Sequence, residues 1–172
     1  AVFRRERLSV SYLFDVSDIT ITDEEEASSN IIKLEGENVT SSITTGLAYD
    51  SRDRAFNTTR GSKHMIDFEY AGIGGDFDFS KYTAKTAWYW PLFWKLVGAT
   101  KAQGGYITGS DIPDYEKFYI GGINTIRGVD RDDISQREDP SDPDSPLIGG
   151  DSYAVFNLEM SFPIGEEVGL YG

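Results

Sequence analysis

Apolar and polar side chains alternate with a period of two along several stretches of the chain. In residues 4–16, Leu8, Val10, Tyr12 and Phe14 fall on one face, and Arg5, Arg7, Ser9 and Ser11 on the other. Successive side chains of a β-strand point to opposite faces, so this pattern predicts a strand with one apolar and one polar face. The same alternation predicts further strands at 41–50, just after residue 61, at 81–90 and at 152–162, and the stretch from about 95 to 108, rich in Gly and small residues, is expected to form another.

The segments between these predicted strands differ in length in a regular way. Residues 17–40 and 109–149 form long connections and 71–80 an intermediate one, whereas 50–61, 90–95 and 163–167 are short. Outer-membrane barrels have this asymmetry, with short periplasmic turns and longer external loops. We therefore expect an all-β, antiparallel, up-and-down transmembrane β-barrel with its short turns in the periplasm. The first long connection has room for a short helical turn near residues 27–34.

A cluster of aromatic side chains surrounds the short turn that contains Pro91. Its members are Trp88, Tyr89, Trp90, Phe93 and Trp94. Amphipathic rings of this kind are enriched where a barrel meets the lipid headgroups, so we interpret Trp88, Trp90, Phe93 and Trp94 as membrane-interface aromatics. The alternative is the aromatic core of a soluble β-sandwich, because alternation alone does not tell an inward apolar face from an outward one.

Composition narrows the function classes. The formal net charge of -13 argues against a nucleic-acid partner, since phosphate backbones require clustered Lys and Arg. The chain has no Cys and a single histidine, His64, so neither thiolate metal sites nor a Ser-His-Asp constellation is indicated. We place His64 on the barrel exterior near the periplasmic interface. No catalytic residue, metal or cofactor is expected.

Acidic side chains gather in the second half of the long connection at 109–149. They are Asp130, Asp132, Asp133, Asp139, Asp142 and Asp144. Carboxylates could bind calcium, but their spacing does not match the EF-hand pattern, so a solvated external surface is the favoured interpretation.

The sequence FYIGGINTIRGV at residues 118–129 lies in the middle of the same long connection. It resembles the hallmark of the BamA/surface-antigen superfamily: a Gly-Gly pair followed by an aliphatic residue, Arg, Gly and an aromatic, on a large loop that folds back into the lumen. The corresponding residues here are Gly121, Gly122, Ile126, Arg127, Gly128 and Val129. Val129 departs from the pattern, since the family usually has Phe or Tyr there. Residues 46–61, the stretch from Gly74 to Leu92 and residues 149–164 extend the similarity to nearly the whole chain.

The resemblance implies a fold and a function. Residues 1–172 would form one partial barrel domain, including the external loop 109–149, with about six strands of a parent barrel of about sixteen. No segment resembles a POTRA domain, the first barrel strands, or the last two strands and C-terminal signal, so the piece alone should be inactive. Its parent would be a non-enzymatic assembly factor of the outer membrane of Gram-negative bacteria that folds and inserts β-barrel proteins. The implied partners are unfolded barrel clients, accessory lipoproteins and outer-membrane lipid.

Arg127 needs an anionic partner if the loop carries its guanidinium into a lumen. Glu159 is the local candidate, because its position in the last predicted strand puts it on the lumen face, where the resemblance also places an acidic partner. We therefore predict that an Arg127–Glu159 contact holds the loop inside the barrel. A generic solvated loop arginine is the alternative.

Three rival functions stay open at this point. A two-partner secretion transporter or a translocation and assembly module would share the barrel and the loop motif. A passive porin would use the loop as a constriction, and a soluble β-sandwich binding module would need no membrane. The open edges of an incomplete barrel also favour self-association of the fragment.

Overall fold

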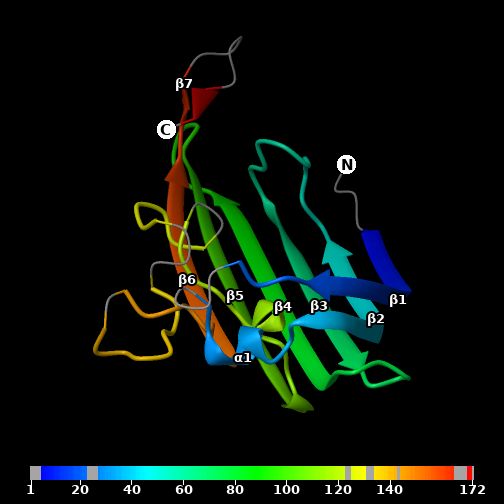
Figure 1. Cartoon of the computed structure of the whole chain (residues 1–172). Coiled ribbons are helices and arrows are strands. Elements are labelled where there is room, and N and C mark those ends of the chain that lie inside the picture. Colours follow the sequence, from blue (N-terminus) through cyan, green and yellow to red (C-terminus); the bar gives the residue numbers. More distant parts are fainter. Residues whose placement is uncertain are drawn as a thin grey trace.

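Six antiparallel strands in sequence order make up the body of the protein (Figure 1). The structure is a computed structural model that describes residues 5–22, 27–122, 125–130, 134–142, 144–164 and 170–171. The strands are β1 (Arg5–Ile19), β2 (Gly36–Asp50), β3 (Gly61–Ala71), β4 (Asp78–Pro91), β5 (Val97–Asp111) and β6 (Ser152–Ser161). Each pairs with the next, so the sheet is a meander with β1 and β6 at its edges. Two short strands, β7 (Pro163–Ile164) and β8 (Leu170–Tyr171), form a separate pair.

The predicted antiparallel all-β fold is confirmed, and each of the six predicted strands is present. The largest difference is at β2, which begins at Gly36 rather than at residue 41. Pairing with β1 continues without interruption from Arg5↔Asp50 to Ile19↔Gly36, although the side chains at 36–40 do not alternate. Backbone hydrogen bonds thus extend the hairpin beyond the hydrophobic pattern. The helix α1 (Ser29–Ile32) lies inside the segment where a helical turn was expected.

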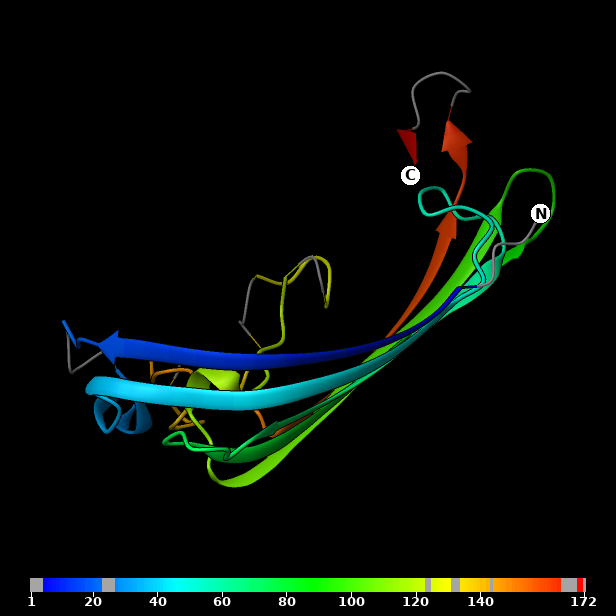
Figure 2. The ribbon, with the colours of Figure 1, turned by 90° about the vertical axis from the view of Figure 1, so that its right-hand side faces the viewer.

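The sheet is strongly curved, with a concave and a convex face (Figure 2). The convex face carries the apolar side chains of the alternating pattern: Leu8 is 68% exposed, Ile66 60% and Leu158 70%. The concave face carries polar and charged side chains, among them Lys81, Lys85 and Glu159. An apolar exterior and a polar interior are what a barrel wall in a bilayer requires, because its outer face is solvated by lipid.

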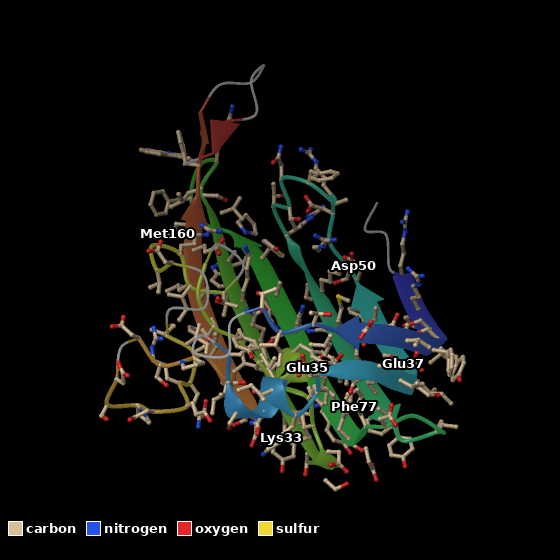
Figure 3. All side chains as sticks on the ribbon, in the orientation of Figure 1. Lys33, Glu35, Glu37, Asp50, Phe77 and Met160 are labelled. Carbon is tan, nitrogen blue, oxygen red and sulfur yellow. The ribbon has the colours of Figure 1, made fainter. Side chains whose placement is uncertain are left out.

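The two ends of the sheet carry different connections. Residues 20–35, 72–77 and 112–151 link strands at one end, and residues 51–60 and 92–96 link them at the other. Figure 3 shows this polarity: Asp50 lies toward the end with short connections, whereas Lys33, Glu35 and Phe77 lie at the opposite end. The predicted short turn at 163–167 includes residues 165–167, which are outside the described residues. No helix in the described ranges has the length and apolar character to cross a membrane.

A small apolar core lies at the end with the long connections. Ala71, Phe77, Phe79 and Ile107 are buried there, and Leu34, Ile112 and Phe118 pack against them. The core therefore joins β3, β4 and β5 to all three connections at this end, 20–35, 72–77 and 112–151. It positions the segment that leads into the motif loop.

Candidate functional site

The connection between β5 and β6 carries the glycine and arginine motif, and its two halves come together in a narrow neck. Phe118 and Gly150 exchange two backbone hydrogen bonds, of 2.9 and 2.8 Å. The Phe118 ring lies on the concave face against Gly105 of β5, where a Cβ atom would come within 2.5 Å of Cζ. Its other neighbours are the Tyr153 ring, at 4.8 Å between centroids, and Lys81 Nζ, at 5.4 Å from the ring centroid. Gly105 thus provides the space for this ring.

The motif itself forms a compact turn. Gly121 and Gly122 have φ values of +141° and +79°, a region that glycine adopts without steric cost. The Thr125 hydroxyl closes the turn, since it donates to the Gly121 carbonyl at 2.7 Å and accepts from the Gly121 N–H at 2.9 Å. The Gly122 N–H also donates to the Val129 carbonyl at 3.0 Å. Residues 123 and 124 lie outside the described residues. The glycine pair therefore shapes the turn that carries Arg127.

The structure brings Arg127 and Glu159 together. Arg127 Nη2 lies 3.2 Å from Glu159 Oε1, and Lys101 Nζ of the neighbouring strand β5 lies 2.8 Å from Glu159 Oε2. The Arg127 side chain is 68% exposed and the Glu159 side chain 27%, so this is a solvent-accessible contact. A second link lies next to it, where Asn157 Nδ2 donates to the Thr125 carbonyl at 3.3 Å. Both links join the motif turn to β6.

A second set of polar contacts, which the sequence analysis missed, joins the base of this loop to α1. Asp114 is fully buried, and its carboxylate accepts hydrogen bonds from Ser28 Oγ at 2.9 Å and Asn30 Nδ2 at 3.2 Å. Lys117 Nζ lies 3.3 Å from the same carboxylate. Ser28 is also the N-cap of α1, because its hydroxyl accepts from the Ile31 N–H at 3.3 Å. We call Ser28, Asn30, Asp114 and Lys117 the loop clasp.

A further contact lies beside the loop clasp, between Ser29 and Glu138 in the outer part of the motif loop. The Ser29 hydroxyl and backbone N–H both donate to the Glu138 carboxylate. These hydrogen bonds lower the pKa of Glu138 below its ordinary value. The first and third long connections are thus tied at two places. Side chains 84 and 86 residues apart in sequence meet in the loop clasp, and no local pattern indicates such a contact.

The aromatic cluster lies at the other end of the sheet. Trp88 and Trp90 are on the convex face and are 53% and 38% exposed, while Phe93 and Trp94 in the turn are 65% and 93% exposed. The Trp90 ring covers Gly98 of β5, where a Cβ would meet Nε1 at 2.7 Å. The exposed rings therefore form a patch at the edge of the apolar convex face, which is where a barrel carries its interfacial girdle.

His64 also lies on the convex face. Its Nδ1 is 2.7 Å from Thr86 Oγ1, and its ring contacts Trp88 with centroids 4.9 Å apart. Within the part of the chain that the structure describes, no group of three or more His, Cys, Asp or Glu side chains could hold a metal ion. The acidic residues Asp132 and Asp133 lie outside that part.

Comparisons with known proteins place these features in a family. The family model of the Omp85 superfamily domain matches residues 2–170. The chain is 35% identical over 170 residues to the outer membrane protein assembly factor BamA of Nitratidesulfovibrio vulgaris. This match covers 95% of this chain and 20% of that protein. The chain is also 28% identical over 142 residues to the sorting and assembly machinery component 50 homolog of Mus musculus. This match covers 80% of this chain and 29% of that protein.

A solved structure supports the same fold. The crystal structure of BamA from Haemophilus ducreyi lacking POTRA domains 1–3 matches with a TM-score of 0.70 and 21% identity, over 95% of this chain and 36% of that chain. The chain therefore spans a minor part of the length of each of these relatives. The barrel fold agrees with the curved sheet, and the family match agrees with the motif at 118–129. This chain belongs to the Omp85 superfamily.

Proposed function

We propose that this chain is part of the barrel of an outer-membrane assembly factor that folds and inserts β-barrel proteins into the bacterial outer membrane. The observation that carries the proposal is the motif turn on the concave face, with Arg127 bound to Glu159, in a chain of the Omp85 superfamily. The names of the curated relatives, assembly factor BamA and sorting and assembly machinery component 50, support an assembly role. On this proposal, residues 1–172 are one stretch of barrel domain that includes the loop 109–149.

The proposed activity needs no covalent chemistry. An unfolded strand that enters lipid must not expose unpaired N–H and C=O groups, so a barrel that offers a strand edge lowers the barrier to insertion. The client strand would pair with that edge by β-augmentation. The proposed partners are therefore unfolded barrel clients, accessory lipoproteins of the assembly complex and the lipid itself, and the proposed protein is not an enzyme.

Arg127 would hold the motif loop against the wall. The loop is attached at its neck by Phe118 and Gly150, and at its tip by Arg127 and by the Thr125 carbonyl. The neck and the Asn157 contact remain if the Arg127 side chain is removed, so the loop would stay attached while its tip loses one of its two links to the wall. We propose that this contact keeps the barrel in the shape in which it accepts clients.

The test is the folding rate of a denatured barrel protein in proteoliposomes that contain the full-length protein. Wild-type protein should accelerate folding, and Arg127→Ala should reduce that acceleration about fivefold, the equivalent of one exposed ion pair of about 1 kcal/mol. Arg137→Ala is the matched control, because Arg137 lies in the same loop and its Nη1 donates to the Ser145 carbonyl instead of the wall. No acceleration of folding by wild-type protein would favour a secretion pore or a porin. An equal loss of acceleration in Arg127→Ala and Arg137→Ala would show that the Arg127 contact has no specific role.

A further inference from the structure

Three lysines of neighbouring strands meet on the concave face. Lys63 of β3, Lys85 of β4 and Lys101 of β5 share this face, and the register places Met65 opposite Lys85 and Ala87 between Lys63 and Lys101. They line a hollow of about 240 Å³ in the wall, together with Met65, Gln103 and Asn157. We call these three lysines the concave lysine cluster. Such a concentration of cations is notable in a chain with a formal net charge of -13.

Two carboxylates near the concave lysine cluster neutralise part of its charge, Asp50 beside Lys63 and Glu159 beside Lys101, and each is shared with an arginine. Asp50, which lies opposite Lys63 in the register, binds the Arg52 guanidinium with Oδ2 2.8 Å from Nη2. Glu159 is shared between Lys101 and Arg127. Neither of these carboxylates is therefore available to neutralise Lys85.

The next carboxylate along the wall points away from the cluster. Asp67 Oδ1 lies over Gly46 of β2, 2.5 Å from where a Cβ would stand, so its side chain is directed toward β2 and away from β4. Among the residues that the structure describes, neither Lys63 nor Lys85 forms an ion pair within 4.0 Å. On β1, Arg5 and Arg7 continue the positive charge across the same face. The hollow is thus a locally cationic site in which Lys85 is exposed and without an ion pair among the described residues, while Lys63 and Lys101 are partly buried.

We infer that the concave lysine cluster binds acidic segments of an unfolded polypeptide on the lumen side of the barrel. This inference rests on the proposed function, because that function is what brings unfolded chains to this wall. Charge complementarity supports the occupant, since a positive concave surface raises the local concentration of anionic ligands. Met65 and Ala87 beside the lysines can contact the apolar parts of such a segment.

The use of lysine rather than arginine indicates loose binding. An ammonium group is a hydrated point charge that needs no bidentate geometry, so it accepts carboxylates in many orientations. Exposed pairs of this kind are weak and screened by salt. The concave lysine cluster should therefore retain acidic stretches of different sequences briefly and release them, which suits a client that must leave.

The experiment uses the full-length protein in proteoliposomes with a photo-crosslinking residue in place of Gln103, which lines the hollow. The probes are a labelled unstructured peptide rich in Asp and the same peptide with Asn at each Asp. The Asp peptide should crosslink, the Asn peptide should not, and Lys63→Gln with Lys85→Gln should reduce the yield about tenfold. Lys33→Gln is the matched control, because Lys33 is exposed at the opposite end of the sheet.

Four outcomes decide the inference. Equal crosslinking of the Asp and Asn peptides in the wild-type protein would overturn it, and this comparison needs no variant to fold. A yield unaffected by the two lysine substitutions would overturn it as well. A crosslinking yield that falls with inorganic phosphate but not with chloride at the same ionic strength would assign the site to phosphate groups instead. A yield that falls with the two lysine substitutions, and also with chloride salt in the absence of phosphate, would support the inference.

The same proteoliposomes separate this inference from the proposed function. If wild-type protein accelerates client folding but shows no charge-dependent crosslinking, only the peptide site is wrong. If it does not accelerate folding but still captures the Asp peptide, the assembly role is wrong and the anionic peptide site stands.

Discussion

Arg127 and Glu159 lie 32 residues apart in sequence, and they meet on the concave face with Arg127 Nη2 3.2 Å from Glu159 Oε1. The second carboxylate oxygen of Glu159 binds Lys101 Nζ at 2.8 Å. Glu159 therefore neutralises two cations, one from the motif loop and one from the barrel wall. A simple exchange of the Arg127 and Glu159 charges would place an arginine beside Lys101.

The first prediction follows from this shared carboxylate. Arg127→Glu and Glu159→Arg together should restore little of the folding acceleration lost in either single variant, because Lys101 would repel the new arginine. Adding Lys101→Glu should restore most of it, since all three charges are then reversed and both pairs re-form. Folding rates of a denatured barrel client in proteoliposomes measure the effect, which should be about fivefold or less per exposed pair.

The contrary result would be equally clear. Full recovery in the double exchange would show that Lys101 contributes nothing to the site. No recovery in the triple reversal would show that the acceleration depends on the arginine itself and not on its ion pair with β6.

The second prediction concerns the loop clasp. Asp114→Asn keeps the shape of the buried side chain but removes the charge that pairs with Lys117 and one acceptor oxygen, so either Asn30, which uses Oδ1, or Ser28, which uses Oδ2, also loses its hydrogen-bond acceptor. A buried polar group left without its partner costs about 1–3 kcal/mol. Amide hydrogen exchange should therefore accelerate in residues 27–34 and 112–119 together, because the clasp joins them.

Asp144→Asn serves as its control, since Asp144 is exposed in the same long connection. Faster exchange in 112–119 without any change in 27–34 would mean that the two connections are not coupled through Asp114. An equal effect in both variants would point to the loss of negative charge instead of the loss of the clasp.

Much of the fold could be predicted from the sequence, because alternation reports which face each strand side chain occupies. The polar start of β2 could not, since backbone pairing with β1 continues where the side chains no longer alternate. The alternation along the last strand also placed Glu159 on the polar, concave face. Together with the family resemblance, this placement predicted the pairing of Glu159 with Arg127. That contact is present, while its role in assembly stays a prediction.

The loop clasp could not be predicted, for a different physical reason. Asp114, Ser28 and Asn30 belong to two connections whose paths depend on the apolar core around Phe79 and Ile107. A polar residue in a connection is by default solvated, and nothing local marks Asp114 as the carboxylate that becomes fully buried. The contact of Lys101 with Glu159, in contrast, could have been predicted from the alternation of faces. Lys101 lies opposite Asn157 in the register and diagonally from Glu159 on the same face.

The third prediction tests the neck of the motif loop. Gly105→Ala would place a Cβ 2.5 Å from the Phe118 ring and 2.8 Å from the Tyr153 ring, so the Phe118 ring must move away from the wall. Overpacking of this kind costs about 1–3 kcal/mol. The substitution should lower the thermal midpoint and make residues 118–150 more sensitive to protease.

Two further variants define this effect. Gly104→Ala is the neighbouring control, since its Cβ would point to the other face and its nearest contact is the Tyr153 carbonyl at 3.0 Å. Phe118→Leu in the Gly105→Ala background should recover part of the lost stability, because the smaller side chain leaves room for the methyl group. A larger loss in the double variant would show that the two positions do not share this space.

The last prediction is a pH dependence in the short connection 51–60. Burial raises the pKa of Asp53, but hydrogen bonds from the Thr59 side chain and from backbone N–H groups outweigh burial and hold the pKa below its ordinary value of 3.8. Oδ1 accepts from the Thr59 and Arg60 N–H groups at 3.0 and 3.2 Å, and Oδ2 accepts from the Thr59 hydroxyl. The ionised carboxylate thus stabilises this turn. Since the pKa is lowered, that contribution is present above pH 3.8 and lost as the pH falls through the folded value.

Amide hydrogen exchange, corrected for the intrinsic rate, measures this loss. The Thr59 and Arg60 amides should lose protection in that pH range, whereas the Ser51 N–H, which donates to the Ser62 carbonyl at 2.8 Å, should not. In Asp53→Asn the two amides should be less protected at neutral pH and show no such step, and an unchanged step would assign it to another group.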